Sequence, residues 1–263
     1  MTKPLLPHDD VVNKKETIYL YDDNIGCVQY IQHMGSDKTA VSAARVSFGK
    51  DNDEALNEKD INLIKYLLEN NHTSPFEHSN ITFKMTVPLF VRSQHMRHRT
   101  WKYVSINEIS RRYTSENLGF YEPLKFRTQH SNDRQASNEG ELINPVVGSC
   151  GYLDDNEEFI INHASRAVKN HNKECLALYN DLIKNGICRE QARGVLPQNL
   201  YTEYFCTTDL HNLMHFLKLR LDKRAQWEIV QVAKACLEIT EEHFPETMKI
   251  WKSMNDFASS NSS

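Results

Sequence analysis

The sequence predicts a single α+β domain in which a central β-sheet is flanked by helices, and three observations predict it. The chain has 263 residues, 40% hydrophobic and 25% charged, so it can bury a substantial core. Stretches with the two-residue alternation of strands occur among stretches with helical periodicity. No internal repeat and no linker divides the chain, which favours one domain over residues 16–250.

The first elements of the domain are predicted to be a hairpin and a short helix. The runs 17–21 and 27–31 are rich in strand-forming residues and are separated by a turn signal of Asp, Asn and Gly. Ser36 or Asp37 can then cap a helix that continues through Arg45.

A longer helix and a strand are expected next. The helix begins at Glu58 and ends near Asn70, because four apolar residues recur on one face: Ile61, Ile64, Leu67 and Leu68. A polar turn follows over 72–78. Residues 79–87 then alternate apolar and polar side chains, which is typical of a half-buried strand.

The second half of the chain is expected to be mainly helical, with one strand. Its predicted elements are a long helix over 156–185, a short helix over 189–193, a strand over 201–206, a helix over 210–220 capped by Asp209, and a final helix over 225–243.

Three polar segments are not expected to form regular structure. Residues 1–15 are predicted to be a loose N-terminus, and 251–263 a disordered tail whose last residues are rich in Ser and Asn. Residues 125–151 are rich in Asn, Ser and Gly, and we interpret them as an excursion or flexible loop within the domain.

Composition and charge exclude several classes of function. The net charge of −4 does not favour a nucleic-acid partner, and no apolar run is long enough to span a membrane. The N-terminus has neither the apolar core of a signal peptide nor the composition of a transit peptide, so a cytoplasmic location is expected. None of the six cysteines forms a C-x-x-C pair, and reduced thiols are therefore expected.

A cluster of cations lies between Gln94 and Tyr113. Pro88 predicts a helix over 89–97 that brings the first arginines to its C-terminal end. The five cations of the cluster are Arg97, Arg99, Lys102, Arg111 and Arg112. Because arginine binds phosphate or carboxylate through two points, the cluster predicts an anionic, phosphorylated ligand. The alternative interpretation is an ordinary arginine-rich surface.

The common nucleotide and hydrolase motifs are missing. The chain has no G-x-G-x-x-G, no P-loop, no H-E-x-x-H and no G-x-S-x-G. His72, Glu77 and His78 could bind a metal together with His95 or His98, but their spacing matches no helical ligand pair, and no metal site is expected. Further polar residues gather over 189–193 and 209–220, where arginines beside apolar stripes can also be explained by packing of their stems.

The blocks of polar residues together resemble the flavin-dependent thymidylate synthases. Arg97-His-Arg99 and the polar residues over 105–113 resemble that family's R-H-R-x-x-S-x-N-x-x-S-x-R pattern, with three residues inserted around 102–104. The turn 72–78 resembles its H-x-[ST]-P-F-E-H block. Two more blocks, over 192–202 and 216–229, complete a resemblance that covers about 35–245 in order.

The resemblance implies that the chain converts dUMP to dTMP. The carbon would come from 5,10-methylenetetrahydrofolate and the electrons from NADPH through bound FAD, while the protein orients these molecules. The residues implied at FAD are His72, Ser74, Arg97, His98, Arg99, Glu108, Asp209, Leu210, His211 and His215. The residues implied at dUMP are Gln94, Arg97, Glu108, Ser110, Arg111, Arg112, Arg193 and Arg220.

Among these residues, Arg220 is implied to be catalytic. It would stabilise negative charge on uracil as N3 ionises and C5 becomes nucleophilic. Ser110 would bind the nucleotide and would not be a nucleophile. His211 and His215 stand where relatives often have Arg and Asn. The resemblance also implies a homotetramer with sites at subunit junctions, and no nucleic-acid or membrane partner.

Two other functions are compatible with the residues. A non-catalytic nucleotide- or RNA-binding module would use the arginine cluster and would show strong salt dependence without flavin. A metal-dependent phosphohydrolase would use the histidines of 72–78 and would lose activity to chelators.

Overall fold

A five-stranded antiparallel sheet is the centre of the protein. The computed structural model describes residues 17–47, 49, 55–99, 105–116, 118–148, 152–153, 159–160 and 162–255, so the predicted loose N-terminus lies outside the described residues. The strand order is β1 (Thr17–Tyr19), β2 (Cys27–Met34), β3 (Asn80–Pro88), β9 (Tyr201–Asp209) and β4 (Ser105–Glu108). The predicted hairpin, the strand over 79–87 and the strand over 201–206 are confirmed, and β4 was not expected.

The two central strands pair along their whole length. β3 and β9 are in register from Asn80 opposite Asp209 to Pro88 opposite Tyr201. The alternating apolar side chains of β3 are at most 1% exposed: Ile81, Phe83, Met85 and Val87. The apolar side chains of the two-residue alternation therefore lie on the covered face of the sheet, as expected.

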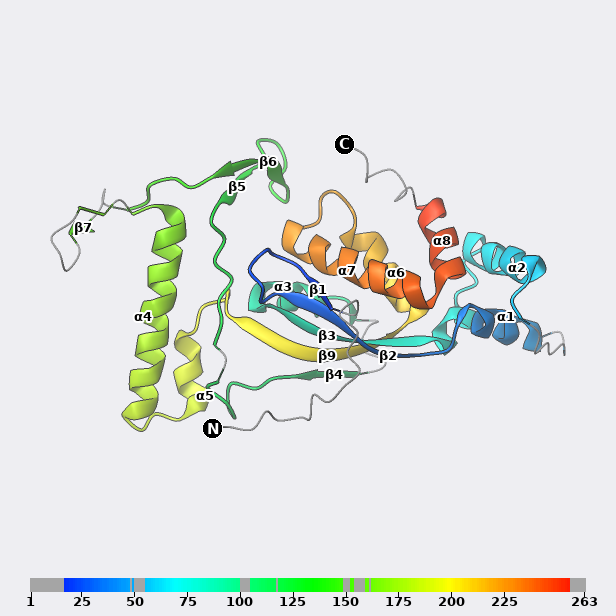
Figure 1. Ribbon diagram of the computed structural model, residues 1–263, viewed down its shortest axis with the longest axis horizontal. Coiled ribbons are helices and arrows are strands. Elements are labelled where there is room, and N and C mark those ends of the chain that lie inside the picture. Colours follow the sequence, from blue (N-terminus) through cyan, green and yellow to red (C-terminus); the bar gives the residue numbers. More distant parts are fainter. Residues whose placement is uncertain are drawn as a thin grey trace.

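Three helices cover one face of this sheet (Figure 1). They are α3 (Leu89–His95), α6 (Leu210–Arg220) and α7 (Trp227–His243). The predicted cap of α6 is confirmed, since the Asp209 carboxylate accepts a hydrogen bond from the Asn212 backbone N at 2.8 Å. The helix α3 ends at His95 instead of residue 97, because the chain tightens there into turns in which the N–H groups of Arg97 and His98 bond to carbonyls three residues back.

A second group of helices packs beside the end of the sheet. It contains α1 (Asp37–Val46), α2 (Glu58–Glu69), the short 3-10 helix η2 (Ser74–His78) and α8 (Pro245–Met254). The first two were predicted, and the Asn57 side chain caps α2. The helix α8 contradicts two expectations, because α7 is not the final helix and 251–254 are not disordered.

Packing explains why α8 forms. Pro245 occupies its first turn, and Met248 and Trp251 are buried on the face toward α2 and α7. The buried Asp37 carboxylate accepts hydrogen bonds from the backbone N of Glu246 and Thr247 at 3.0 and 2.9 Å. Of the predicted tail over 251–263, residues 251–255 are therefore described, and 256–263 lie outside the described residues.

The polar excursion over 125–151 is mostly a β-hairpin, contrary to the expectation of a loop. Its strands are β5 (Phe126–Gln129) and β6 (Ser137–Ile143). Arg127 ties the hairpin to α7 through an ion pair with Glu228 at 2.6 Å and lies over the Trp227 ring. This tertiary contact stabilises strands whose own side chains are largely exposed.

The predicted helix over 156–185 begins later than expected. The structure has α4 (Ala164–Lys184), preceded by a small hairpin of β7 (Tyr152–Leu153) and β8 (Phe159–Ile160). The helix stands away from the sheet (Figure 1). It leads into the expected short helix, α5 (Arg189–Ala192), and then η4 (Arg193–Val195). No helix among the described residues is long and apolar enough to cross a membrane.

Candidate active site

An arginine-lined cavity lies at the end of β4 and β9. Its volume is about 450 Å³, and four of the predicted substrate residues line it: Glu108, Ser110, Arg111 and Arg193. The other lining residues are Leu89, Ile109, Gly194, Leu196, Gln198, Leu200, Tyr201 and Thr202. The structure thus brings the end of the cation cluster together with η4, which lies about eighty residues later in the chain.

Glu108 is fixed at the wall of this cavity by two neighbours. Its Oε2 forms an ion pair with Nη2 of Arg92, which comes from α3. Its Oε1 accepts a hydrogen bond from the Thr202 hydroxyl at 2.8 Å. The carboxylate is therefore held in one orientation by Arg92 and Thr202.

The three arginines around the cavity differ in their surroundings. Arg111 donates to the backbone carbonyls of Glu116 at 2.6 Å and Tyr201 at 3.4 Å, and burial lowers its pKa. Arg112 is exposed and pairs with Glu190 at 3.2 Å. Arg193 is exposed on η4 and has no ion pair with any acid in the described part of the chain.

Gln94 lies at the end of a chain of partly buried polar groups. Its Nε2 donates to Oε1 of Gln226, and Gln226 Nε2 donates to Glu228 Oε2 at 2.9 Å. Arg127 and the Tyr121 hydroxyl, at 2.6 and 3.2 Å, hold the other carboxylate oxygen. Because a carboxylate only accepts, Glu228 fixes the orientation of both amides. The sequence analysis missed Gln226 and Glu228, although both stand in the block over 216–229.

Arg220 is bound to a neutral histidine. Its Nε donates to His98 Nε2 at 2.8 Å. Burial, with Arg220 and His215 nearby, lowers the pKa of His98 to about 4, so its ring nitrogen is free of a proton and accepts this bond. Arg220 does not line the arginine-lined cavity. Within a single chain, the predicted catalytic residue is therefore not among the residues that line this cavity.

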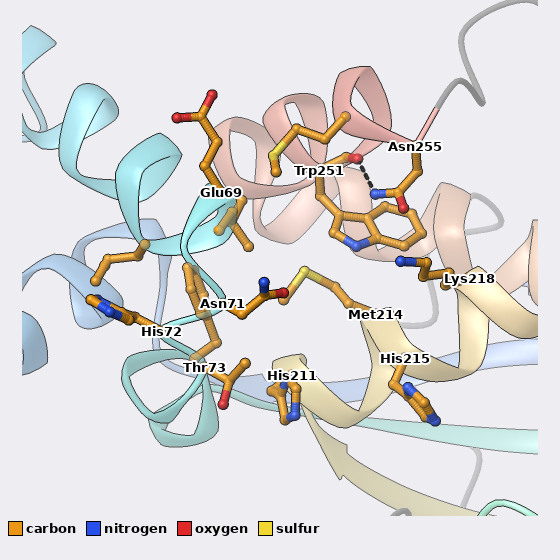
Figure 2. A pocket seen from close by; sticks show the side chains of 14 residues that line it. Glu69, Asn71, His72, Thr73, His211, Met214, His215, Lys218, Trp251 and Asn255 are labelled. Atoms are coloured by element: carbon orange, nitrogen blue, oxygen red, sulfur yellow. Dashed lines mark hydrogen bonds between the residues drawn. The ribbon is translucent and has the colours of Figure 1, made fainter.

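A second pocket lies between α2, η2, α6 and α8, and its charged lining residues are Glu69 and Lys218. Its volume is about 350 Å³, and it is lined by three predicted flavin residues, His72, His211 and His215. Figure 2 shows His211 and His215 on the same side of α6, with Thr73 near His211. The same figure shows Lys218 of α6 pointing toward the ring of Trp251, which belongs to α8. Imidazole and ammonium nitrogens at one pocket suit an anionic ligand.

The remaining predicted flavin residues lie in varied places. Ser74 is exposed on η2, and Arg97 and Arg99 are exposed just after α3. The side chains of Asp209 and Leu210 serve the fold instead, since one caps α6 and the other is 2% exposed in the core.

The proposed metal ligands do not form a cluster. No group of three or more His, Cys, Asp or Glu that could hold a metal ion occurs in the described part of the chain. His72 and His78 are both exposed, and the inserted residues around 102–104 lie outside the described residues.

The fold and these cavities define an α+β protein with one cavity lined by arginines and another lined by histidines, and comparisons give its family. The family model of the thymidylate synthase complementing protein matches residues 29–246. A flavin-dependent thymidylate synthase of Thermus thermophilus is 42% identical over 220 residues, which are 84% of this chain and 73% of the relative. One from Wolbachia pipientis is 38% identical, covering 84% and 71%.

Solved structures agree with these relatives. The UMP/dUMP methylase PolB of Streptomyces cacaoi, bound with 5-Br dUMP, superposes with a TM-score of 0.69 at 31% identity, covering 87% of this chain and 95% of that one. The chain therefore belongs to the family of flavin-dependent thymidylate synthases, which confirms the predicted family and fold class.

Proposed function

We propose that the protein methylates C5 of dUMP to give dTMP. The observation that carries this proposal is the arginine-lined cavity, which gathers Glu108, Ser110, Arg111 and Arg193 in a member of this family. Its volume, about 450 Å³, suits a nucleotide. A structural neighbour of this chain holds a bromo analogue of dUMP.

The overall reaction needs a carbon donor and a reductant. We take these to be 5,10-methylenetetrahydrofolate and NADPH, so that dUMP, the folate, NADPH and a proton give dTMP, tetrahydrofolate and NADP⁺. Bound FAD would supply the redox chemistry that transfers electrons between them. The protein supplies binding, orientation and charge.

Within the cavity, arginines would hold the phosphate of dUMP. Arg111 and Arg193 line the cavity, and Arg112 is next to it in sequence, so planar guanidinium groups can bind phosphate oxygens in pairs. Ser110 and Glu108 would contact the nucleoside, and Gln94 would present an amide whose orientation is already fixed. Arg97, which is exposed just after α3, would contact either dUMP or FAD.

Arg220 would act as a fixed positive charge beside uracil. The hydrogen bond to neutral His98 leaves its charge undiminished while holding Nε in place. Such a cation stabilises the negative charge that develops as N3 ionises and C5 attacks the carbon donor. Because Arg220 does not line the cavity of its own chain, we propose that a neighbouring subunit supplies it, in a homotetramer with sites at subunit junctions.

The second pocket would hold the anionic part of FAD. His72, His211, His215 and Lys218 offer four nitrogen groups to a pyrophosphate. Ser74, His98 and Arg99, from the adjoining turns, would complete this site. The expectation of a cytoplasmic location remains a prediction that cell fractionation can check.

A product assay tests this proposal. The purified protein is incubated with FAD, dUMP, NADPH and the folate, and the nucleotide is analysed by mass spectrometry. We expect a nucleotide heavier than dUMP by one CH₂ group, and no product when either co-substrate is left out. A protein that binds flavin and dUMP but forms no dTMP would show that the reaction is wrong.

A further inference from the structure

Arg92 lies beside the substrate cavity without lining it. It projects from α3 and forms an ion pair with Oε2 of Glu108 on β4, and the two side chains are 32% and 22% exposed. Thr202 occupies the other carboxylate oxygen at 2.8 Å. Both oxygens of Glu108 are thus held by groups of the same chain.

This ion pair matters because the cavity contains other cations. Arg193 and Arg111 line the same cavity as Glu108. Arg193 pairs with no acid among the described residues, so its charge is available to a ligand. A carboxylate released within the cavity would be attracted to these guanidinium groups, since opposite charges in a partly buried site interact strongly.

We propose that Arg92 is a positioning residue that keeps Glu108 from competing with the nucleotide phosphate for the arginines of the cavity. The inference rests on the proposed function, in which the ligand is dUMP. The pair of Arg92 and Glu108 carries no net charge, so the cavity presents the positive charges of Arg111 and Arg193. A phosphate monoester carries close to two negative charges at neutral pH and matches them.

A double-mutant cycle tests this role. The dissociation constant of dUMP is measured by calorimetric titration of the FAD-loaded protein for four forms: wild type, Arg92→Met, Glu108→Gln and the double variant. We expect Arg92→Met alone to weaken dUMP binding about tenfold, on the scale of one charge-assisted hydrogen bond. In the Glu108→Gln background, where no carboxylate can compete, the same change should alter binding less than about twofold.

Matched variants separate positioning from general stability. Arg92→Lys keeps the counter-charge and should bind dUMP within about threefold of wild type. Lys252→Met breaks an ion pair with Glu241 between α8 and α7, away from the cavity, and should leave dUMP binding unchanged. If Arg92→Met does not fold, Arg92→Gln replaces it in the cycle.

The outcomes are distinct. Equal weakening by Arg92→Met in both backgrounds, or no weakening in either, would overturn the positioning role. A wild-type protein that binds flavin but no dUMP would instead count against the proposed function, whatever the variants do.

Discussion

Acidification should destabilise the fold through one buried histidine, His95. This side chain at the end of α3 is 1% exposed, and its Nδ1 lies 2.9 Å from the Tyr204 hydroxyl. These two groups share a hydrogen bond, and burial raises the pKa of the Tyr204 hydroxyl, which therefore stays protonated. Burial also keeps the His95 imidazole neutral in the folded protein, because it lowers the pKa of the ring.

The size of the effect follows from the shift in pKa. Burial first, and then His98, Arg220 and Arg92, lower the pKa of His95 from 6.5 to about 3 in the folded protein. Below pH 6.5 the unfolded chain takes up a proton that the folded chain does not, so the free energy of unfolding falls as pH falls. Each pH unit between about 6 and 3 costs about 1.4 kcal/mol, and the loss between pH 8 and 4.5 is about 3 kcal/mol.

Urea unfolding measures this contribution. Wild type and His95→Gln are unfolded at several pH values from 4.5 to 8 at one protein concentration, because assembly also affects stability. The carboxylates titrate alike in both proteins, so the difference between the curves isolates His95. His95→Gln should lose less stability on acidification, by about 3 kcal/mol at pH 4.5. His171→Gln, an exposed control on α4, should follow wild type. Parallel curves for wild type and His95→Gln would refute the reasoning.

Three further predictions concern the reaction and the helix contacts. Arg220→Ala should keep dUMP and FAD binding detectable by titration but abolish methyl transfer, and normal turnover would show that its catalytic role is wrong. Asp60→Ala should lower the free energy of unfolding, measured with urea, by about 3 kcal/mol. Asp60 is 0% exposed and pairs with Lys38 and Arg45, and both cations would lose their partner. Asp37→Ala should cost about 1–2 kcal/mol in the same assay, since it removes the acceptor for two backbone N–H groups of α8, and an unchanged midpoint would contradict this contact.

Much of the fold could be predicted from periodicity and capping. The apolar face of α2, the alternation in β3 and the Asp209 cap of α6 are local signals, and the structure contains all three elements. The helix α8 also carried a local signal, because Pro245 begins it and Met248 and Trp251 stand three residues apart on one face. That signal was available and was overlooked.

Other elements depend on distant contacts that no local pattern reveals. The strand β4 forms because Ser105–Glu108 pairs with the edge of β9, about a hundred residues away. The β5–β6 hairpin is held to α7 by Arg127, whose partner Glu228 follows it by 101 residues. These segments are polar and have few apolar side chains, so their sequences gave no reason to expect β4 or the β5–β6 hairpin.

The sequence could predict which residues belong to the candidate site better than it could predict which of them lie together in space. Four residues that the motifs predict at the site line one cavity: Glu108, Ser110, Arg111 and Arg193. The supporting residue Arg92 belongs to no motif that the resemblance supplied, since its role depends on α3 crossing to β4. The separation of Arg220 from this cavity is a property of three-dimensional packing and could not be read from spacing.

The visible absorption spectrum of the purified protein tests the central claim most directly. It is recorded before and after anaerobic addition of NADPH, with and without dUMP. The account predicts a flavin spectrum that bleaches with NADPH, which would establish the redox half of the reaction. A colourless protein that cannot be reconstituted with FAD would contradict the account.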